Sequence, residues 1–197
     1  VGGMELYHAE SSGIAKDRLT PKLRNTAIAL WKIYLSLTVL CALGYFLSGM
    51  TIFDAVSHSF STVAIGGFST HDASIGYFNS ISIEMVAMFF MFLAGINFSL
   101  HFLAWNNKSF IDYIKDSEFK TYTMVLFVSS IIVIIALGLN SEYSSAIETI
   151  RHSLFQTISI ATTTGYSSQS YSEWPAAIPV FLIMMSFIGA CVGSTGG

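Results

Sequence analysis

The sequence predicts an all-α membrane protein built from repeated helical units. Its composition, four apolar segments of spanning length and a pair of similar short segments between them support this prediction. Of the 197 residues, 53% are hydrophobic and 11% are charged, and the mean hydropathy is +0.62. A typical soluble domain carries about 25% charged residues, so this chain is too poor in charge to cover a globule with polar surface. Its net charge of −3 offers no basic field for nucleic acid.

Four apolar segments reach the roughly 20 residues that a helix needs to cross a hydrocarbon core. They cover residues 27–47, 81–105, 121–139 and 176–192. Backbone groups in lipid must be hydrogen-bonded internally, so each segment is expected to be a helix. The alternative is a set of buried helices in a large soluble core. Both cysteines lie inside apolar runs, which indicates packing and gives no disulfide or metal signature.

The basic residues predict the orientation of these spans. All nine Lys and Arg residues except Arg151 lie before or at the start of the first span, or between the second and third spans. The positive-inside rule therefore places residues 1–25 and 106–120 in the cytoplasm and residues 48–80 and 140–175 outside. The three tryptophans lie near the ends of spans, as an interfacial belt would place them.

Both outward connections open with a semi-apolar stretch, at residues 51–63 and 144–161. At about 1.5 Å per helical residue, neither is long enough to cross a bilayer. Each then breaks into small, polar and glycine residues. The apolar content favours helices that re-enter the membrane over surface loops. Non-helical backbone at that depth is tolerated only where protein buries it or where it lines a water-filled cavity.

The two re-entrant stretches resemble each other at an offset of 98 residues. When Gly67 is aligned with Gly165, a serine precedes each glycine by six positions and an aromatic residue follows it directly. The order of span, short helix, glycine turn and span also repeats. An internal repeat in a membrane protein suggests a pathway on the pseudo-symmetry axis. Both stretches enter from the outside, so the repeat is parallel.

The chain after each short helix contains the residues that a cation filter needs. A dehydrated cation requires several oxygens, which inward-pointing backbone carbonyls can supply. Glycine permits the necessary dihedral angles, threonine adds hydroxyl oxygens, and the C-terminal end of a helix carries partial negative charge. The first predicted filter segment is Ala64, Ile65, Gly66 and Gly67, and the second is Thr162, Thr163, Thr164 and Gly165. An ordinary structural turn is the alternative for each.

A glycine-rich run ends the fourth apolar segment, at Gly189, Gly193, Ser194, Thr195, Gly196 and Gly197. Each glycine costs roughly 1 kcal/mol against alanine in a helix, so the helix is poorly held here. A broken helix at membrane depth could project beneath the filter segments and block them as a gate. Close helix packing through small residues is the alternative, and composition alone does not decide between the two.

Residues 58–70, 155–166 and 189–197 resemble the Trk/Ktr/HKT superfamily of potassium uptake proteins, most closely its bacterial TrkH type. The resemblance covers nearly the whole chain. It implies four repeats of outer helix, pore helix, filter loop and inner helix, in a pseudo-fourfold arrangement around one pore. The one filter glycine of each repeat corresponds to Gly67 and Gly165, and the glycine-rich run corresponds to the intramembrane gate of the family.

The resemblance also implies a division of the chain, which is read as an internal piece of a longer protein. Residues 1–25 are expected to be the cytoplasmic connection after the first repeat, and residues 26–105 the second repeat. Residues 106–120 are a further cytoplasmic connection, and residues 121–197 are the third repeat, truncated in its inner helix. The first and fourth filter segments are then absent, so this piece alone is not expected to conduct.

The implied function is potassium uptake through a channel-like pore, with potassium as the transported ligand. Both filter segments lack the full T-V-G-Y-G of tetrameric potassium channels, so only a modest preference over sodium is expected. The resemblance implies a homodimer in the bacterial inner (plasma) membrane and a cytoplasmic TrkA-type nucleotide-binding ring as partner. No cofactor, resident metal or nucleic acid is predicted. The basic connections are candidate docking surfaces, or they serve only to set the topology.

Two other classes of function stay open. One is a secondary transporter that couples potassium to protons or sodium at a central site, and the other is a membrane-embedded enzyme or scaffold. The parallel repeat favours a pore, because inverted repeats would place the re-entrant loops on opposite faces. The sequence has no phosphate-binding glycine loop with lysine and no nucleophile elbow. An enzyme is therefore not predicted.

Several polar residues lie in or beside the apolar segments. Asn97 and His101 are four residues apart and are expected to share a helix face, with a packing role for His101 near the cytoplasmic interface. Glu84 either attracts cations at the outer mouth or lies exposed like a cap. Asp54 and Glu148 are near the starts of the short helices, where negative charge suits the helix dipole.

Overall fold

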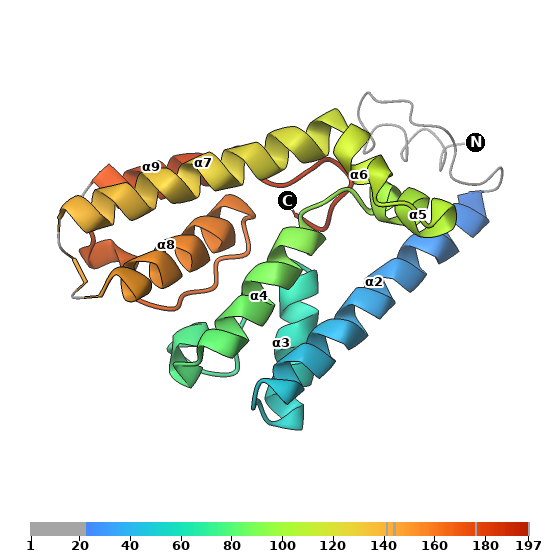
Figure 1. Ribbon diagram of the computed structural model, residues 1–197. Helices are drawn as coiled ribbons and strands as arrows, with labels where there is room; N and C mark the ends of the chain where they lie inside the picture. The colour runs from blue at the N-terminus through green and yellow to red at the C-terminus, as the bar shows by residue number, and fades with distance from the viewer. Residues whose placement is uncertain (1–22, 141, 144, 176, 197) are drawn as a thin grey trace.

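The computed structural model describes residues 23–140, 142–143, 145–175 and 177–196 (Figure 1). Most of the predicted connection 1–25, and Gly197 of the predicted gate, lie outside the described residues. Within the described ranges all regular structure is helical and no strand occurs, which confirms the predicted all-α class. Two described helices are long and apolar enough to cross a membrane, and a bent pair adds a third span if it is counted as one.

The first half of the described chain holds a long helix, a short helix and a bent pair. The elements are α2 (Leu23–Leu47), α3 (Ile52–Val63), the 3-10 helix η1 (Ser74–Phe78), α4 (Ile81–Ala94) and α5 (Phe98–Asn107). Helix α2 agrees with the first predicted span. Helix α3 begins after Thr51, whose hydroxyl accepts a hydrogen bond from the backbone N–H of Asp54. The predicted short helix therefore forms within one residue of its expected bounds.

The prediction of one continuous helix over residues 81–105 is wrong. Helices α4 and α5 meet at an angle of 92°. Gly95 follows the last residue of α4, and the side chain of Asn97 caps α5 by accepting from the N–H of Ser99 at 2.8 Å. The carbonyls of Ala94 and Gly95 accept hydrogen bonds from Thr195 and Cys191. At the bend, carbonyls that lack a partner within the helix are therefore hydrogen-bonded by the C-terminal segment.

The second half repeats the order of long helix, short helix and loop. Its elements are α6 (Ile111–Lys115), α7 (Ser117–Leu139), α8 (Ala146–Ala161), the 3-10 helix η2 (Tyr171–Glu173) and α9 (Ala177–Ser186). Helix α7 contains the third predicted span. The fourth predicted span, 176–192, is too long, because α9 ends at Ser186 and residues 187–196 are not helical. The helix therefore stops before the glycine-rich run and not within it.

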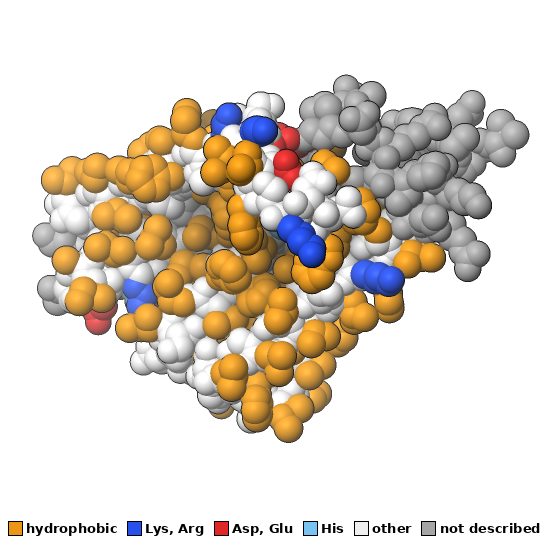
Figure 2. Space-filling view, turned by 45° about the vertical axis from the view of Figure 1, so that its right-hand side comes forward, with side chains coloured by type: hydrophobic (Ala, Val, Ile, Leu, Met, Phe, Trp, Pro, Cys, Tyr) orange, Lys and Arg blue, Asp and Glu red, His pale blue; other side chains and the backbone are white. Residues whose placement is uncertain are grey.

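The helices pack in two groups that meet between α4 and α8 (Figure 1). Helices α2, α3 and α4 form one group, and α7, α8 and α9 form the other. The C-terminal segment runs from α9 to the junction of α4 and α5 (Figure 1). Many hydrophobic side chains are exposed on the face in Figure 2. Trp31 and Leu47 are among the exposed large hydrophobic residues of the described chain. Such a surface suits contact with lipid or with further protein.

Candidate functional site

The two predicted filter segments have the same backbone conformation. Each begins with the C-cap residue of its short helix, and the two caps have nearly identical geometry, with φ −78° and ψ −2° at Ala64 and φ −78° and ψ −3° at Thr162. The next residue is left-handed in both, with φ +52° at Ile65 and +67° at Thr163. The glycines are left-handed as well, with φ +66° at Gly67 and +83° at Gly165. Non-glycine residues rarely adopt this region, so its recurrence at one offset is specific.

The two segments lie in contact, although 98 positions separate them in the sequence. A Cβ atom placed on Gly67 would lie 2.9 Å from the carbonyl carbon of Thr164 and 3.2 Å from that of Gly165. Among the described residues, no hydrogen bond ends on a backbone oxygen of residues 64–67 or 162–165. These oxygens are therefore available to a ligand, and the C-terminal ends of α3 and α8 add negative potential beside them.

The loops that follow the two segments also join. The N–H of Gly76 donates to the carbonyl of Ser167 at 3.0 Å, and the N–H of Ser167 donates to the hydroxyl of Ser74 at 3.2 Å. A polar pocket of about 570 Å³ lies between these loops and is lined by residues that include Asp72, Ser170 and Tyr171. The loops that follow the two segments thus share one pocket.

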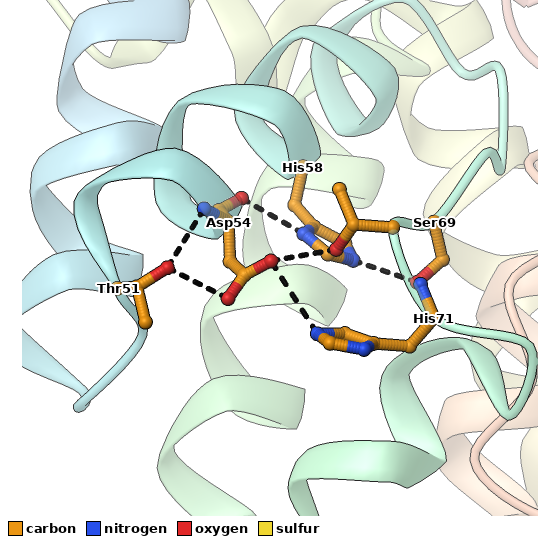
Figure 3. A network of polar contacts seen from close by, with 6 residues as sticks. Thr51, Asp54, His58, Ser69 and His71 are labelled. Atoms are coloured by element: carbon orange, nitrogen blue, oxygen red, sulfur yellow. Dashed lines mark hydrogen bonds and ion pairs between the residues drawn. The ribbon is translucent and has the colours of Figure 1, made fainter.

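Helix α3 is tied to the loop after the first segment by a polar network (Figure 3). The carboxylate of Asp54 accepts from the hydroxyls of Thr51 at 2.7 Å and Thr70 at 2.6 Å, and lies 3.4 Å from Nε2 of His71. His58 Nε2 lies 2.9 Å from the hydroxyl of Ser69. The bonds from the two threonines lower the pKa of Asp54 below its usual value, and burial lowers the pKa of His58. These contacts hold the start of α3 against residues 69–71 of the loop.

The aromatic residue after the second segment is anchored on the helix of the other unit. The hydroxyl of Tyr166 donates to the carbonyl of His58 at 3.2 Å and accepts from the hydroxyl of Thr62 at 3.2 Å. Tyr166 is 1% exposed, whereas its counterpart Phe68 is 81% exposed. Helix α3 therefore supports the backbone of both predicted filter segments.

The predicted gate run lies against the break between α4 and α5. Gly189 and Gly193 are left-handed, with φ +67° and +76°. The Thr195 hydroxyl donates to the carbonyl of Val63 at 2.7 Å, at the end of α3, and to that of Ala94 at 3.2 Å. A Cβ atom on Gly196 would lie 3.5 Å from the side chain of Ile65. The run therefore contacts both the bend and the first predicted filter segment.

Sequence reasoning missed a buried ion pair between the two units. Glu84, 1% exposed on α4, accepts from Arg151 on α8 at 2.7 Å and 2.8 Å. The prediction that Glu84 lies exposed like a cap is wrong, because its carboxylate is buried against Arg151, and a role in attracting cations stays a prediction. The signal was available, since Arg151 is the one basic residue in the outward connections and charges in membranes pair with one another.

The remaining polar predictions have mixed outcomes. Asp54 and Glu148 lie in the first turns of α3 and α8, as predicted. His101 is buried and contacts the Tyr113 hydroxyl at 2.7 Å and the Leu93 carbonyl at 2.9 Å, so its packing role is confirmed. The prediction that Asn97 and His101 share a helix face is wrong, because Asn97 is the N-cap that precedes the helix. Both cysteines are buried, and neither forms a disulfide bond among the described residues.

Comparison with known proteins gives one consistent answer. A family model described as "TrkH: Cation transport protein" matches residues 1–197. The whole chain is 50% identical to the Trk system potassium uptake protein TrkH of Halomonas elongata and 47% identical to that of Escherichia coli K12, and it covers 41% of each. The structure also resembles the crystal structure of the potassium transporter TrkH from Vibrio parahaemolyticus, with 46% sequence identity and a TM-score of 0.87. The superposition covers 90% of the present chain and 38% of the Vibrio chain.

These matches agree with the architecture of the described residues, with its long apolar helices and two short helices that end in glycine turns. The chain spans about two fifths of the length of the relatives named above, at 41% of each. The chain belongs to the TrkH family of cation transport proteins.

Proposed function

We propose that this chain supplies the second and third of four pore units in a potassium uptake protein. The proposal is carried by the contact between two segments that have left-handed backbone at the same two positions. Within the described residues, their carbonyl oxygens accept no hydrogen bond. The names of the relatives, potassium uptake proteins of the Trk system, support potassium as the transported ion.

In this proposal, potassium loses part of its water shell at the filter segments and gains backbone oxygens from residues 64–67 and 162–165. The partial negative charge at the ends of α3 and α8 offsets the cost of dehydration. The segments offer few ordered rings of oxygens, so the preference for potassium over sodium is modest. The units before and after this chain complete the ring.

Ion permeability of the full-length protein tests the proposal. After reconstitution into liposomes, we expect potassium to permeate better than sodium, by a modest factor. The measurement is the reversal potential under opposed potassium and sodium gradients, with protein-free liposomes as the control. Equal permeability of the two ions would refute a filter built from these segments.

The run from Gly189 to Gly197 is proposed to act as the gate beneath the filter. Its attachment includes the Thr195 hydroxyl, which donates to the carbonyls of Val63 and Ala94. Replacing Thr195 by valine keeps the shape and removes these bonds, and one hydrogen bond corresponds to about a fivefold change in an equilibrium. We therefore expect T195V to raise potassium uptake by about threefold to tenfold.

Potassium uptake by cells that produce T195V is compared with that of T121V, normalised to the amount of protein in the membrane. Thr121 is exposed on α7 and bonds only to its own helix among the described residues, so T121V should behave like the parent protein. Equal uptake by the two variants would count against a gating role for the run.

The full-length protein is proposed to work as a homodimer in the bacterial inner membrane, with a cytoplasmic TrkA-type ring as its regulatory partner. Symport of potassium with protons or sodium is the alternative mechanism. A proton or sodium gradient that drives potassium uphill in liposomes would favour symport. The parallel orientation of the two loop units and their contact favour the pore.

A further inference from the structure

Two hydrogen bonds join α3 to the loop after the first predicted filter segment (Figure 3). The Thr70 hydroxyl donates to the Asp54 carboxylate at 2.6 Å, and His58 Nε2 lies 2.9 Å from the Ser69 hydroxyl. His58 is fully buried and Asp54 is 8% exposed. We call this pair of bonds the first clamp. It spans the filter segment, because its helix residues precede the segment and its loop residues follow Gly67.

The second unit contains a matching pair of bonds. Gln156 Nε2 donates to the Ser167 hydroxyl at 3.2 Å, and His152 Nδ1 lies 3.1 Å from the Ser168 hydroxyl. Gln156 Nε2 also donates to the carbonyl of Gln169 at 2.8 Å. Gln156 is fully buried and His152 is 5% exposed. We call this pair of bonds the second clamp.

Every member of the second clamp lies 98 positions after its counterpart in the first clamp. The helix residues differ in kind, since Asp54 corresponds to His152 and His58 corresponds to Gln156. The geometry is retained although the chemistry of the helix residues changes. A buried polar group needs a partner in any fold, but that need does not require the same two loop positions in both units.

We propose that the two clamps are positioning devices which set the spacing of the filter oxygens and thereby the preference among cations. This rests on the proposed function, since it assumes that residues 64–67 and 162–165 form the filter. Each clamp holds the loop residues that follow its filter segment against the short helix that precedes the segment. Movement of these loop residues would change the distance between the carbonyl oxygens of the two segments, which touch at Gly67 and Thr164.

The first clamp is expected to be the stronger of the two. A hydrogen bond to a carboxylate is shorter and about twice as strong as a bond between neutral groups. Its 2.6 Å bond to Asp54 compares with 3.1 Å and 3.2 Å in the second clamp. Variants of the first clamp should therefore change ion preference more than variants of the second.

Two loop substitutions, a conservative loop variant and one exchange on the helix test the first clamp. Thr70 is exposed, so T70V should fold while it loses the bond to Asp54, and T70S restores a hydroxyl at the same position. S69A removes the bond to His58. H58Q places in the first clamp the residue that serves in the second. We expect T70V and S69A to lower the potassium-to-sodium permeability ratio of the full-length protein by about threefold to tenfold. T70S and H58Q should stay near the parent value.

The permeability ratio and the half-saturating potassium concentration are measured together in liposomes. Loss of folded protein lowers the maximal rate but leaves both of these quantities unchanged, so a purely structural role is distinguishable. Unchanged values in T70V and S69A would overturn the proposal, as would a T70S variant as altered as T70V. Gly165→Ala separates the two levels of inference. If Gly165→Ala changes the permeability ratio while the clamp variants do not, only the proposal about the clamps fails. If Gly165→Ala also leaves the ratio unchanged, the proposed filter is wrong.

Discussion

Replacement of Gly67 by alanine is expected to lower potassium uptake at least about tenfold. The residue has φ +66°, where a side chain costs about 1–2 kcal/mol, or a factor of roughly five to thirty. In addition, the new Cβ would lie 2.9 Å from the carbonyl carbon of Thr164, which is backbone and cannot move aside alone. The substitution therefore displaces one predicted filter segment from the other. Uptake by cells that produce the full-length variant is the measurement.

Two other glycines serve as graded controls for this variant. Gly165 has φ +83° but open space around a new Cβ, so G165A keeps the conformational cost without the collision. Gly138 lies in α7 and a Cβ there meets nothing within 4 Å, so G138A should leave uptake unchanged. The expected order of uptake is G138A, then G165A, then G67A. A G67A variant as active as G138A would contradict the predicted role of this contact.

Replacement of Arg151 by methionine is expected to lower the free energy of unfolding by about 3–5 kcal/mol. The variant leaves the carboxylate of Glu84 without its guanidinium partner, while Glu84 is only 1% exposed. It also removes the bond from Arg151 to Asn79. The pair joins α4 to α8, so its loss loosens the contact between the two helix groups. Thermal unfolding of the full-length protein in detergent measures the effect.

A double replacement distinguishes the ion pair from simple loss of a side chain. Because breaking a buried pair costs more than replacing both members with apolar residues, E84M with R151M should unfold at a higher temperature than R151M alone. K115M, which changes a charge at the end of α6, serves as the control for charge removal. A midpoint for R151M equal to that of K115M would show that the pair contributes little.

The features that follow from local pattern could be predicted from the sequence. Long apolar runs can only be helices in lipid, so α2 and α7 were predictable. Thr51 and Ser145 cap the short helices, whose lengths were limited by the glycine turns that follow. The offset of 98 between Gly67 and Gly165 predicted two equivalent loops, and in both loops the glycine and the residue two positions before it have left-handed backbone.

The features that depend on distant partners could not be predicted in this way. The bend at Gly95 is stabilised by the N–H of Cys191, about one hundred residues away, and no local pattern specifies that partner. Hydropathy treated residues 81–105 as one span because the apolar content continues through the break. The clamps likewise join residues eleven and sixteen positions apart in sequence. Their helix residues differ between the two units, so a comparison of the two repeats for identical residues could not find them.

The central claim is that main-chain oxygens of the two touching segments bind the transported cation. Crystals of the full-length protein soaked in rubidium test it, because rubidium replaces potassium and its anomalous scattering marks its position. The account predicts rubidium in contact with the carbonyl oxygens of Gly67 and Gly165. Rubidium bound elsewhere along the pore, with none between these two residues, would contradict it.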